Sequence, residues 1–330
     1  MNDRIEGYDF IRSVAILVIF LAHILNIEGV NNAVLLTVRS LSPGLTMSLL
    51  GFLSALLLCS QDRDVGSFLI KRFTRIYISL ALCLSVVLTA HALLGKKVVT
   101  YHVLLHAMGL TAFFEWLQVK NRATIGAGLW FITAILLMYF MLPLLQRLFR
   151  HPRGFLHLSV FVALCTTLHF VMYGAAVTWD VVISFAVGVY LGVNGQTSRL
   201  INAGTIRPLA GTLGLLGVAA LSTAGVLPYE VRGFLFAFYP LAFVPLLFAV
   251  CRKLPTPIVA ASSVFAGLSY EFYILHFYFI NQGFGDFFPP STSLSGQIII
   301  SFLATFALAF VISKFALWFR RVANGYLLAS

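Results

Sequence analysis

The chain has 330 residues, of which 60% are hydrophobic and only 10% charged, and its net charge is +11. A soluble domain carries roughly 25% charged residues, so the composition excludes an ordinary water-soluble protein and favours one whose outer surface faces hydrocarbon. The basic residues gather in short connectors between apolar runs, where they set membrane orientation, and we expect no nucleic-acid partner. No long polar stretch separates two folding units, so we expect residues 1–330 to form a single domain.

Apolar runs of about 20 residues, the length that crosses a bilayer, recur along the chain. We predict an all-α, polytopic membrane helix bundle of about ten transmembrane helices. The second run contains Pro43 and Gly44, which predict a kink or a preceding interfacial turn. The stretch 98–120 is shorter and holds His102 and His106, so a re-entrant or surface-lying helix is expected there. The predicted spans are 10–29, 33–58, 76–95, 127–147, 155–173, 176–194, 208–226, 231–250, 260–282 and 296–318.

Lys and Arg residues are distributed unevenly over the connectors between these spans. With the N-terminus inside, 14 of the 22 fall on the cytoplasmic side, five on the opposite side and three within spans. Cytoplasmic loops carry the excess of basic residues, so both termini are expected in the cytoplasm.

The four cysteines lie in or at the end of apolar runs. None forms a Cys-x-x-Cys pair or stands beside a histidine at metal-ligand spacing. We interpret them as small packing residues and predict neither a disulfide nor a metal site.

The first span carries ionisable side chains, which cost about 3 kcal/mol or more inside a bilayer and usually serve a function there. Asp9 and Arg12 are three residues apart and can pair on one helix face. His23 follows Arg12 by eleven residues, which places both on the same face with His23 about 16 Å deeper. His23 is therefore a candidate for proton transfer, and the alternative is a packing histidine bonded to a neighbouring helix.

Arg72 and Arg75 stand three residues apart at the cytoplasmic entry of the third span. Guanidinium groups bind phosphate oxygens in a bidentate manner, so the two can hold a phosphate group. The alternative is contact with lipid headgroups. Farther on, Trp130 falls at the expected outer interface, where a membrane-belt aromatic is the alternative role.

The ninth span contains a dense polar segment. Tyr273 and His276 are three residues apart and neighbours, whereas Glu271 is about 140° from His276 around the helix and is expected to make a different contact. His276 lies about 24 Å, and His23 about 20 Å, from the cytoplasmic start of its span. The two histidines could frame one reaction centre, and the sequence leaves open whether their helices touch.

Four segments, in this order and over most of the chain, resemble acyltransferase family 3 of bacterial membrane proteins. Leu50 departs from the family's pattern where a serine is common, and Glu271 departs where a smaller residue is expected. The four segments are residues 8–15 with His23, residues 72–75, residues 129–132 with Tyr139 and Pro143, and residues 269–276.

The resemblance implies an O-acyltransferase of the bacterial inner membrane, in a stand-alone form. It would move an acyl group, often acetyl, from cytoplasmic acyl-CoA to a cell-envelope or exported polysaccharide or its lipid-linked precursor. Acyl-CoA is then a co-substrate and no cofactor is permanently bound. The expected partners are acyl-CoA, the glycan acceptor and membrane lipids, while the oligomeric state and the choice of acetyl or succinyl stay open.

The resemblance also implies residue roles. His23 would be the general base, in a direct transfer or through an acyl-His23 intermediate, and Arg12, paired with Asp9, would orient the donor. Arg72 and Arg75 would hold the CoA phosphates. The substrate site would be shaped by Trp130, Tyr139, Glu271, Tyr273 and His276.

Two other classes of function are compatible with the sequence. Ten crossings with interior charges suit a polysaccharide or lipid transporter, although the halves show no internal symmetry. A receptor or assembly scaffold without chemistry is the third possibility, and it predicts that Arg72 and His23 matter only for stability.

Overall fold

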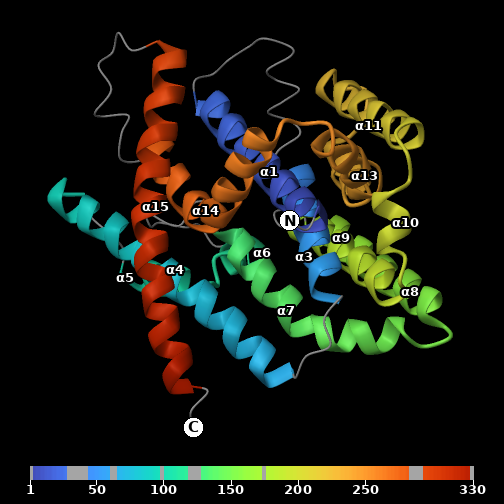
Figure 1. Ribbon diagram of the computed structural model, residues 1–330, viewed down its shortest axis with the longest axis horizontal. Helices are drawn as coiled ribbons and strands as arrows, with labels where there is room; N and C mark the ends of the chain where they lie inside the picture. Colours follow the sequence, from blue (N-terminus) through green and yellow to red (C-terminus); the bar gives the residue numbers. More distant parts are fainter. Residues whose placement is uncertain are drawn as a thin grey trace. The chain divides into compact units, whose positions relative to one another are not determined.

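The computed structural model of the chain describes residues 3–27, 44–59, 65–96, 100–117, 128–172, 176–281 and 293–327. Every regular element in these ranges is a helix, which confirms the all-α prediction (Figure 1). Helices suit a bilayer because they satisfy all backbone hydrogen bonds within one segment. The helices are α1 (Asp3–Ile27), α3 (Gly44–Cys59), α4 (Val65–Leu93), α5 (Thr100–Ala107), α6 (Ala112–Trp116), α7 (Trp130–Phe149), α8 (Gly154–Val171), α9 (Ala176–Val193), α10 (Thr197–Ile201), α11 (Ile206–Thr223), α12 (Tyr229–Phe236), α13 (Pro240–Cys251), α14 (Thr256–Asn281) and α15 (Leu294–Leu327).

Six of the described helices, in α1, α4, α7, α8, α14 and α15, are long and apolar enough to cross a membrane. The other four predicted spans overlap shorter apolar helices, namely Gly44–Cys59, Val177–Val193, Ile206–Ser222 and Pro240–Cys251. A polytopic helical protein is therefore established, while the count of about ten crossings and the side of the termini stay predictions. Pro43 lies outside the described residues, and α3 begins directly after it.

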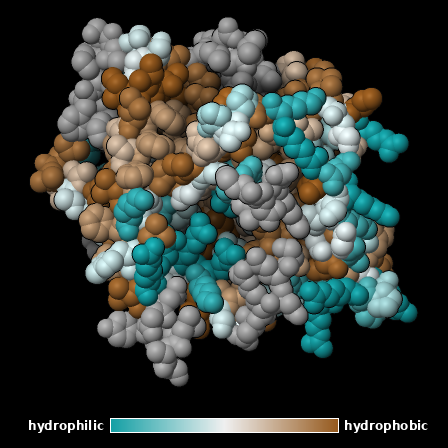
Figure 2. Space-filling view, viewed as in Figure 1, coloured by the Kyte–Doolittle hydropathy of each residue, from teal (hydrophilic) through white to brown (hydrophobic). Residues whose placement is uncertain are grey.

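Large apolar side chains are exposed on several helices. Phe155 is 68% exposed, Phe140 62% and Leu164 56%. Hydrophobic residues cover much of the face seen in Figure 2, and hydrophilic residues gather in patches on it. Exposed apolar surface on this scale is typical of helices that contact lipid.

Three helices end in the same way. Gly95, Gly195 and Gly225 follow α4, α9 and α11 with positive φ angles of 66°, 68° and 75°. The next residue in each case donates its N–H to a carbonyl five residues earlier, as in the 2.9 Å bond from Gln196 to Leu191. This Schellman arrangement needs a residue that tolerates the left-handed region, which glycine does at no steric cost.

The helices group into two compact units. Unit 1 comprises Met1–Ala22, Asn31–Asp62 and Leu137–Ala266. Unit 2 comprises His23–Val30, Arg63–Leu136 and Gly267–Ser330. The helices α1, α7 and α14 each contribute residues to both units. This grouping neither confirms nor contradicts the prediction of a single domain.

Unit 1 is built around the packing of α3 on α9. A Cβ on Gly188 would lie 2.8 Å from the Cβ of Ala55, and one on Gly192 would lie 2.6 Å from the Cβ of Cys59. The two glycines, four residues apart on α9, therefore let the helix backbones approach closely, as small residues do in membrane helix pairs. Ser184 adds a 3.0 Å hydrogen bond to the carbonyl of Ser48.

In unit 2, α4 crosses α15, packs against it and also contacts α5 (Figure 1). The helices α5 and α6 occupy the stretch expected to be re-entrant, and with eight and five residues neither can cross a bilayer. Thr133 on α7 donates to the carbonyl of Gly109 at 2.6 Å, and Tyr77 on α4 donates to that of Met108 at 3.0 Å. The turn between α5 and α6 is thus fixed to α4 and α7.

Candidate active site

Two imidazole rings meet in unit 2. Nδ1 of His23, near the end of α1, lies 2.7 Å from Nε2 of His276 on α14. The rings are nearly parallel, at 13°, with centroids 5.0 Å apart. His276 is only 2% exposed, and His23 is partly buried. The two histidines that the sequence placed at a similar depth therefore touch.

Hydrogen-bond partners decide which nitrogens carry protons. Nδ1 of His276 lies 2.6 Å from the carbonyl oxygen of Tyr273, and because a carbonyl only accepts, this nitrogen must be the donor. In a neutral imidazole the second nitrogen is an acceptor, so Nε2 of His276 accepts a bond from Nδ1–H of His23. Nε2 of His23 then keeps its lone pair, which is what a general base needs.

Aromatic rings hold this pair in place. The ring of Phe277 stands edge-on to His23 with centroids 5.3 Å apart, and Phe272 stacks against His276 at 6.2 Å. The hydroxyl of Tyr273 donates to the carbonyl of Gly128, directly before α7. A fixed ring orientation keeps the lone pair of His23 aimed in one direction, which favours catalysis.

The start of α7 also belongs to this neighbourhood. Phe131 packs edge-on against Tyr273 at 5.7 Å, and Trp130 packs against Phe131 at 5.9 Å. Four predicted site residues, His23, Trp130, Tyr273 and His276, are thereby linked through side-chain contacts in unit 2. Sequence reasoning missed Phe277 and the carbonyl of Gly128, since neither carries a distinctive motif.

Glu271 makes a contact separate from the histidines, as its angle around α14 predicts. Its carboxylate accepts a 2.6 Å hydrogen bond from the hydroxyl of Ser79 on α4, and both residues are buried. Ser79 was missed from the sequence, although it follows Arg75 by one helical turn on the same face. The guanidinium of Arg72 lies over the ring of Phe68, 5.6 Å from its centroid, while Arg75 is exposed.

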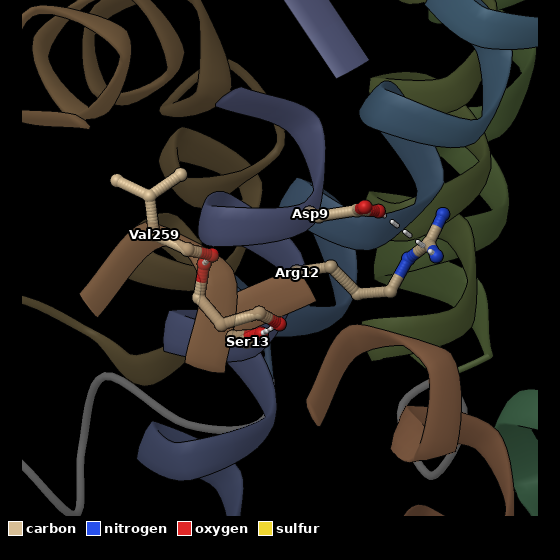
Figure 3. Close-up of polar contacts among 5 residues, drawn as sticks. Asp9, Arg12, Ser13 and Val259 are labelled. Atoms are coloured by element: carbon tan, nitrogen blue, oxygen red, sulfur yellow. Dashed lines mark hydrogen bonds and ion pairs between the residues drawn. The ribbon is translucent and has the colours of Figure 1, made fainter. Parts of the chain in front are cut away.

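Asp9, Arg12 and Tyr139 belong to unit 1. Nη1 of Arg12 lies 3.7 Å from Oδ1 of Asp9, with the side chains 29% and 25% exposed, so the predicted pairing is present (Figure 3). On the next residue, Ser13 donates a 2.7 Å hydrogen bond to the carbonyl of Ser262. Tyr139 lies on α7 and is partly buried.

A buried histidine that is paired with a carboxylate, on α8 in unit 1, was missed. Nδ1 of His169 lies 2.7 Å from Oδ1 of Asp180 on α9, with the side chains 1% and 0% exposed. The available signal was that both are ionisable residues inside predicted spans. Over the ranges that the structure describes, no group of three or more His, Cys, Asp or Glu side chains could hold a metal ion.

Comparison with known proteins gives one match. The family model of the acyltransferase domain of acyltransferase family 3 matches residues 5–314. No curated protein and no solved structure matches the chain. The matched region contains the four motif segments, the pair of His23 and His276, and all of the described helices long enough to span a membrane except the end of α15. The chain therefore belongs to acyltransferase family 3, and it is a multi-pass membrane acyltransferase.

Proposed function

We propose that this acyltransferase transfers an acyl group, in the simplest case acetyl, from cytoplasmic acyl-CoA to a hydroxyl group of a cell-envelope or exported polysaccharide or its lipid-linked precursor. The observation that carries the proposal is the hydrogen-bonded pair of His23 and His276. Its bonding pattern leaves Nε2 of His23 as a proton acceptor, on a ring that is held edge-on by the partly buried Phe277. A lone pair held in this way suits the deprotonation of an alcohol.

The reaction follows from that nitrogen. Nε2 of His23 accepts the proton of the acceptor hydroxyl while its oxygen attacks the thioester carbonyl of acyl-CoA. The carbon–sulfur bond breaks, an ester bond forms, and the CoA thiolate takes the proton back from the imidazolium. His276 stabilises the imidazolium through the bond at Nδ1 of His23. The net change is an alcohol and a thioester converted to an ester and a thiol, with no nucleophile needed from the protein.

The remaining predicted residues serve the two substrates in this scheme. Arg72 and Arg75 bind CoA phosphates, because guanidinium groups recognise phosphate oxygens bidentately. Arg12, held by Asp9, orients the donor. We assign Trp130, Tyr139, Tyr273, His276 and Glu271 to substrate binding.

We place the enzyme in the bacterial inner membrane as one domain of ten crossings, with both termini in the cytoplasm. Among the residues that the structure describes, ten apolar helices, six long and four short, support this topology because each overlaps one predicted span. The excess of Lys and Arg on one side of those spans supports the orientation.

The test is transfer of label from radioactive acetyl-CoA to an envelope polysaccharide fraction by the purified full-length chain in proteoliposomes. We expect His23→Ala to lower the rate roughly 10²- to 10⁴-fold, the usual contribution of a general base. His151→Ala, which removes an exposed histidine, is the matched control and should keep full activity. Full transfer by a folded His23→Ala variant would remove His23 from the mechanism. Glycan movement without any acyl transfer would favour a transporter instead.

A further inference from the structure

The last helix brings an arginine to unit 2 that the motifs do not contain. Arg320 lies near the end of α15, beyond residue 314, where the family match ends. In the sequence it counts only among the basic residues that set orientation. Its position in the fold indicates a more specific role.

Arg320 continues the buried face of α15. Ile312 is 4% exposed and Ala316 is 0% exposed, and the same four-residue step along the helix leads to Arg320. Arg320 is accordingly partly buried, whereas the adjacent Arg321 is exposed. Because α15 packs against α4, this face brings Arg320 to the helix that carries the two arginines of the phosphate motif.

Arg72 has a similar position on α4. It stands four residues after Phe68 and four before Ile76, both of which are buried, and its guanidinium lies over the ring of Phe68. Arg75, one turn before the buried Ser79, is exposed. The N-terminal part of α4 thus carries one partly buried guanidinium, that of Arg72, and one exposed guanidinium, that of Arg75.

The charges around Arg320 connect it to this end of α4. Burial of Arg320 disfavours its charged form, and we expect its guanidinium to repel that of Arg75 and to attract the carboxylate of Glu271, which Ser79 holds through a hydrogen bond. Nε of Arg320 donates to the carbonyl of Ala316 at 3.0 Å, and this bond orients the side chain. The two terminal nitrogens of the guanidinium carry further N–H donors. With Arg75 and Arg320 against the single carboxylate of Glu271, the charges named here have an excess of positive charge.

We propose that Arg320 is a third phosphate-binding residue, which acts with Arg72 and Arg75 on the phosphate groups of acyl-CoA. The inference rests on the proposed function, because it takes acyl-CoA as the donor. CoA carries a pyrophosphate and a separate 3′-phosphate, so it offers anionic partners for more than two guanidinium groups. Arg320 belongs to this site because it continues the buried face of α15, which packs against α4, and because its Nε is oriented by the carbonyl of Ala316.

The experiment compares Arg320→Ala with Arg321→Ala in the full-length chain in proteoliposomes. We expect Arg320→Ala to raise both KM for acetyl-CoA and Kd for CoA, measured by calorimetry, roughly 10- to 100-fold, with kcat nearly unchanged. The exposed Arg321 is the matched control, and its removal should change either constant by less than about twofold. With S-acetyl-pantetheine, a donor without phosphate groups, Arg320→Ala and the wild-type chain should react at equal rates.

An unchanged Kd for CoA in Arg320→Ala would overturn the assignment, and so would an equal loss with the phosphate-free donor. Arg320→Lys keeps the charge but loses the bidentate geometry, so an intermediate Kd is expected, and this variant decides the question if the alanine variant does not fold. The calorimetric Kd for CoA can be measured without turnover, so it tests the role of Arg320 separately from acyl transfer. If the wild-type chain binds CoA but transfers nothing, the proposed function is wrong, and the Kd of Arg320→Ala still shows whether Arg320 binds CoA.

Discussion

Each unit buries a paired histidine, and the two pairs differ in their partner. In unit 1, His169 faces the carboxylate of Asp180, and both side chains are almost completely buried. In unit 2, His23 faces a second imidazole, that of His276, and His23 itself is only partly buried. The partner decides what each histidine can do.

A carboxylate neighbour stabilises a protonated imidazole and satisfies its N–H, so the pair in unit 1 suits a structural link between α8 and α9. A neutral imidazole neighbour that donates to a carbonyl can only accept from the next ring. The pair in unit 2 therefore leaves one nitrogen of His23 as an acceptor, which suits chemistry. Substitutions in the structural pair, His169 and Asp180, and in the catalytic pair, His23 and His276, test this division.

The largest effect is expected from Asp180→Ala. Removing one member of a buried pair leaves the other without its partner and costs about 3–5 kcal/mol of stability. Thermal unfolding in detergent should show this loss, and the double variant His169→Leu, Asp180→Leu should recover much of it. A stable Asp180→Ala protein without transferase activity would instead place the unit 1 pair in the chemistry.

His276→Leu should lower kcat roughly 10²-fold with little change in thermal stability, because Nδ1–H of His23 loses the acceptor that sets its tautomer. His276→Gln should keep most of the activity, since an amide oxygen can accept the same bond. The two variants are compared in the acetyl-transfer assay. If the activity of His276→Gln is as low as that of His276→Leu, the reaction needs a property of the imidazole other than its ability to accept a hydrogen bond.

Gly233→Ala sharpens the comparison by disturbing only the pair in unit 1. The added Cβ would lie 3.0 Å from Oδ2 of Asp180 and 3.2 Å from Cε1 of His169, so we expect a loss of about 1–3 kcal/mol in stability from overpacking. The specific activity of the folded fraction should stay at the wild-type value. Reduced activity at normal stability would show that the packing around the His169–Asp180 pair affects the reaction.

The smallest effect is expected from Asp9→Asn. Its ion pair with Arg12 is long and about a quarter exposed, and such pairs contribute about 1 kcal/mol or less. Thermal unfolding should therefore hardly change, in contrast to Asp180→Ala. A loss as large as that of the buried pair would show that the Asp9 carboxylate is shielded from water.

Much of the fold follows from local rules. The all-helical architecture of the described residues and the approximate position of each apolar helix follow from runs of hydrophobic residues, which a bilayer forces into helices. The bounds did not all follow, since the predicted span 231–250 is divided between α12 and α13, and α4 begins at Val65 and not at residue 76. The spacing of three residues placed Asp9 against Arg12, and the angle of Glu271 separated it from His276. The contact between Gly188 and Ala55 did not follow, because it depends on which helices pack together.

The amino-acid sequence alone determined the class of the protein, most of its helices and the motif residues, because hydrophobicity, helical periodicity and motif order act over short distances along the chain. Only the tertiary structure decided that His23 and His276 share a hydrogen bond, that Ser79 holds Glu271 and that α15, which carries Arg320, packs against α4. These contacts join residues up to 253 positions apart. Side-chain partners at such separations are set by the packing of helices against one another, which no local pattern encodes.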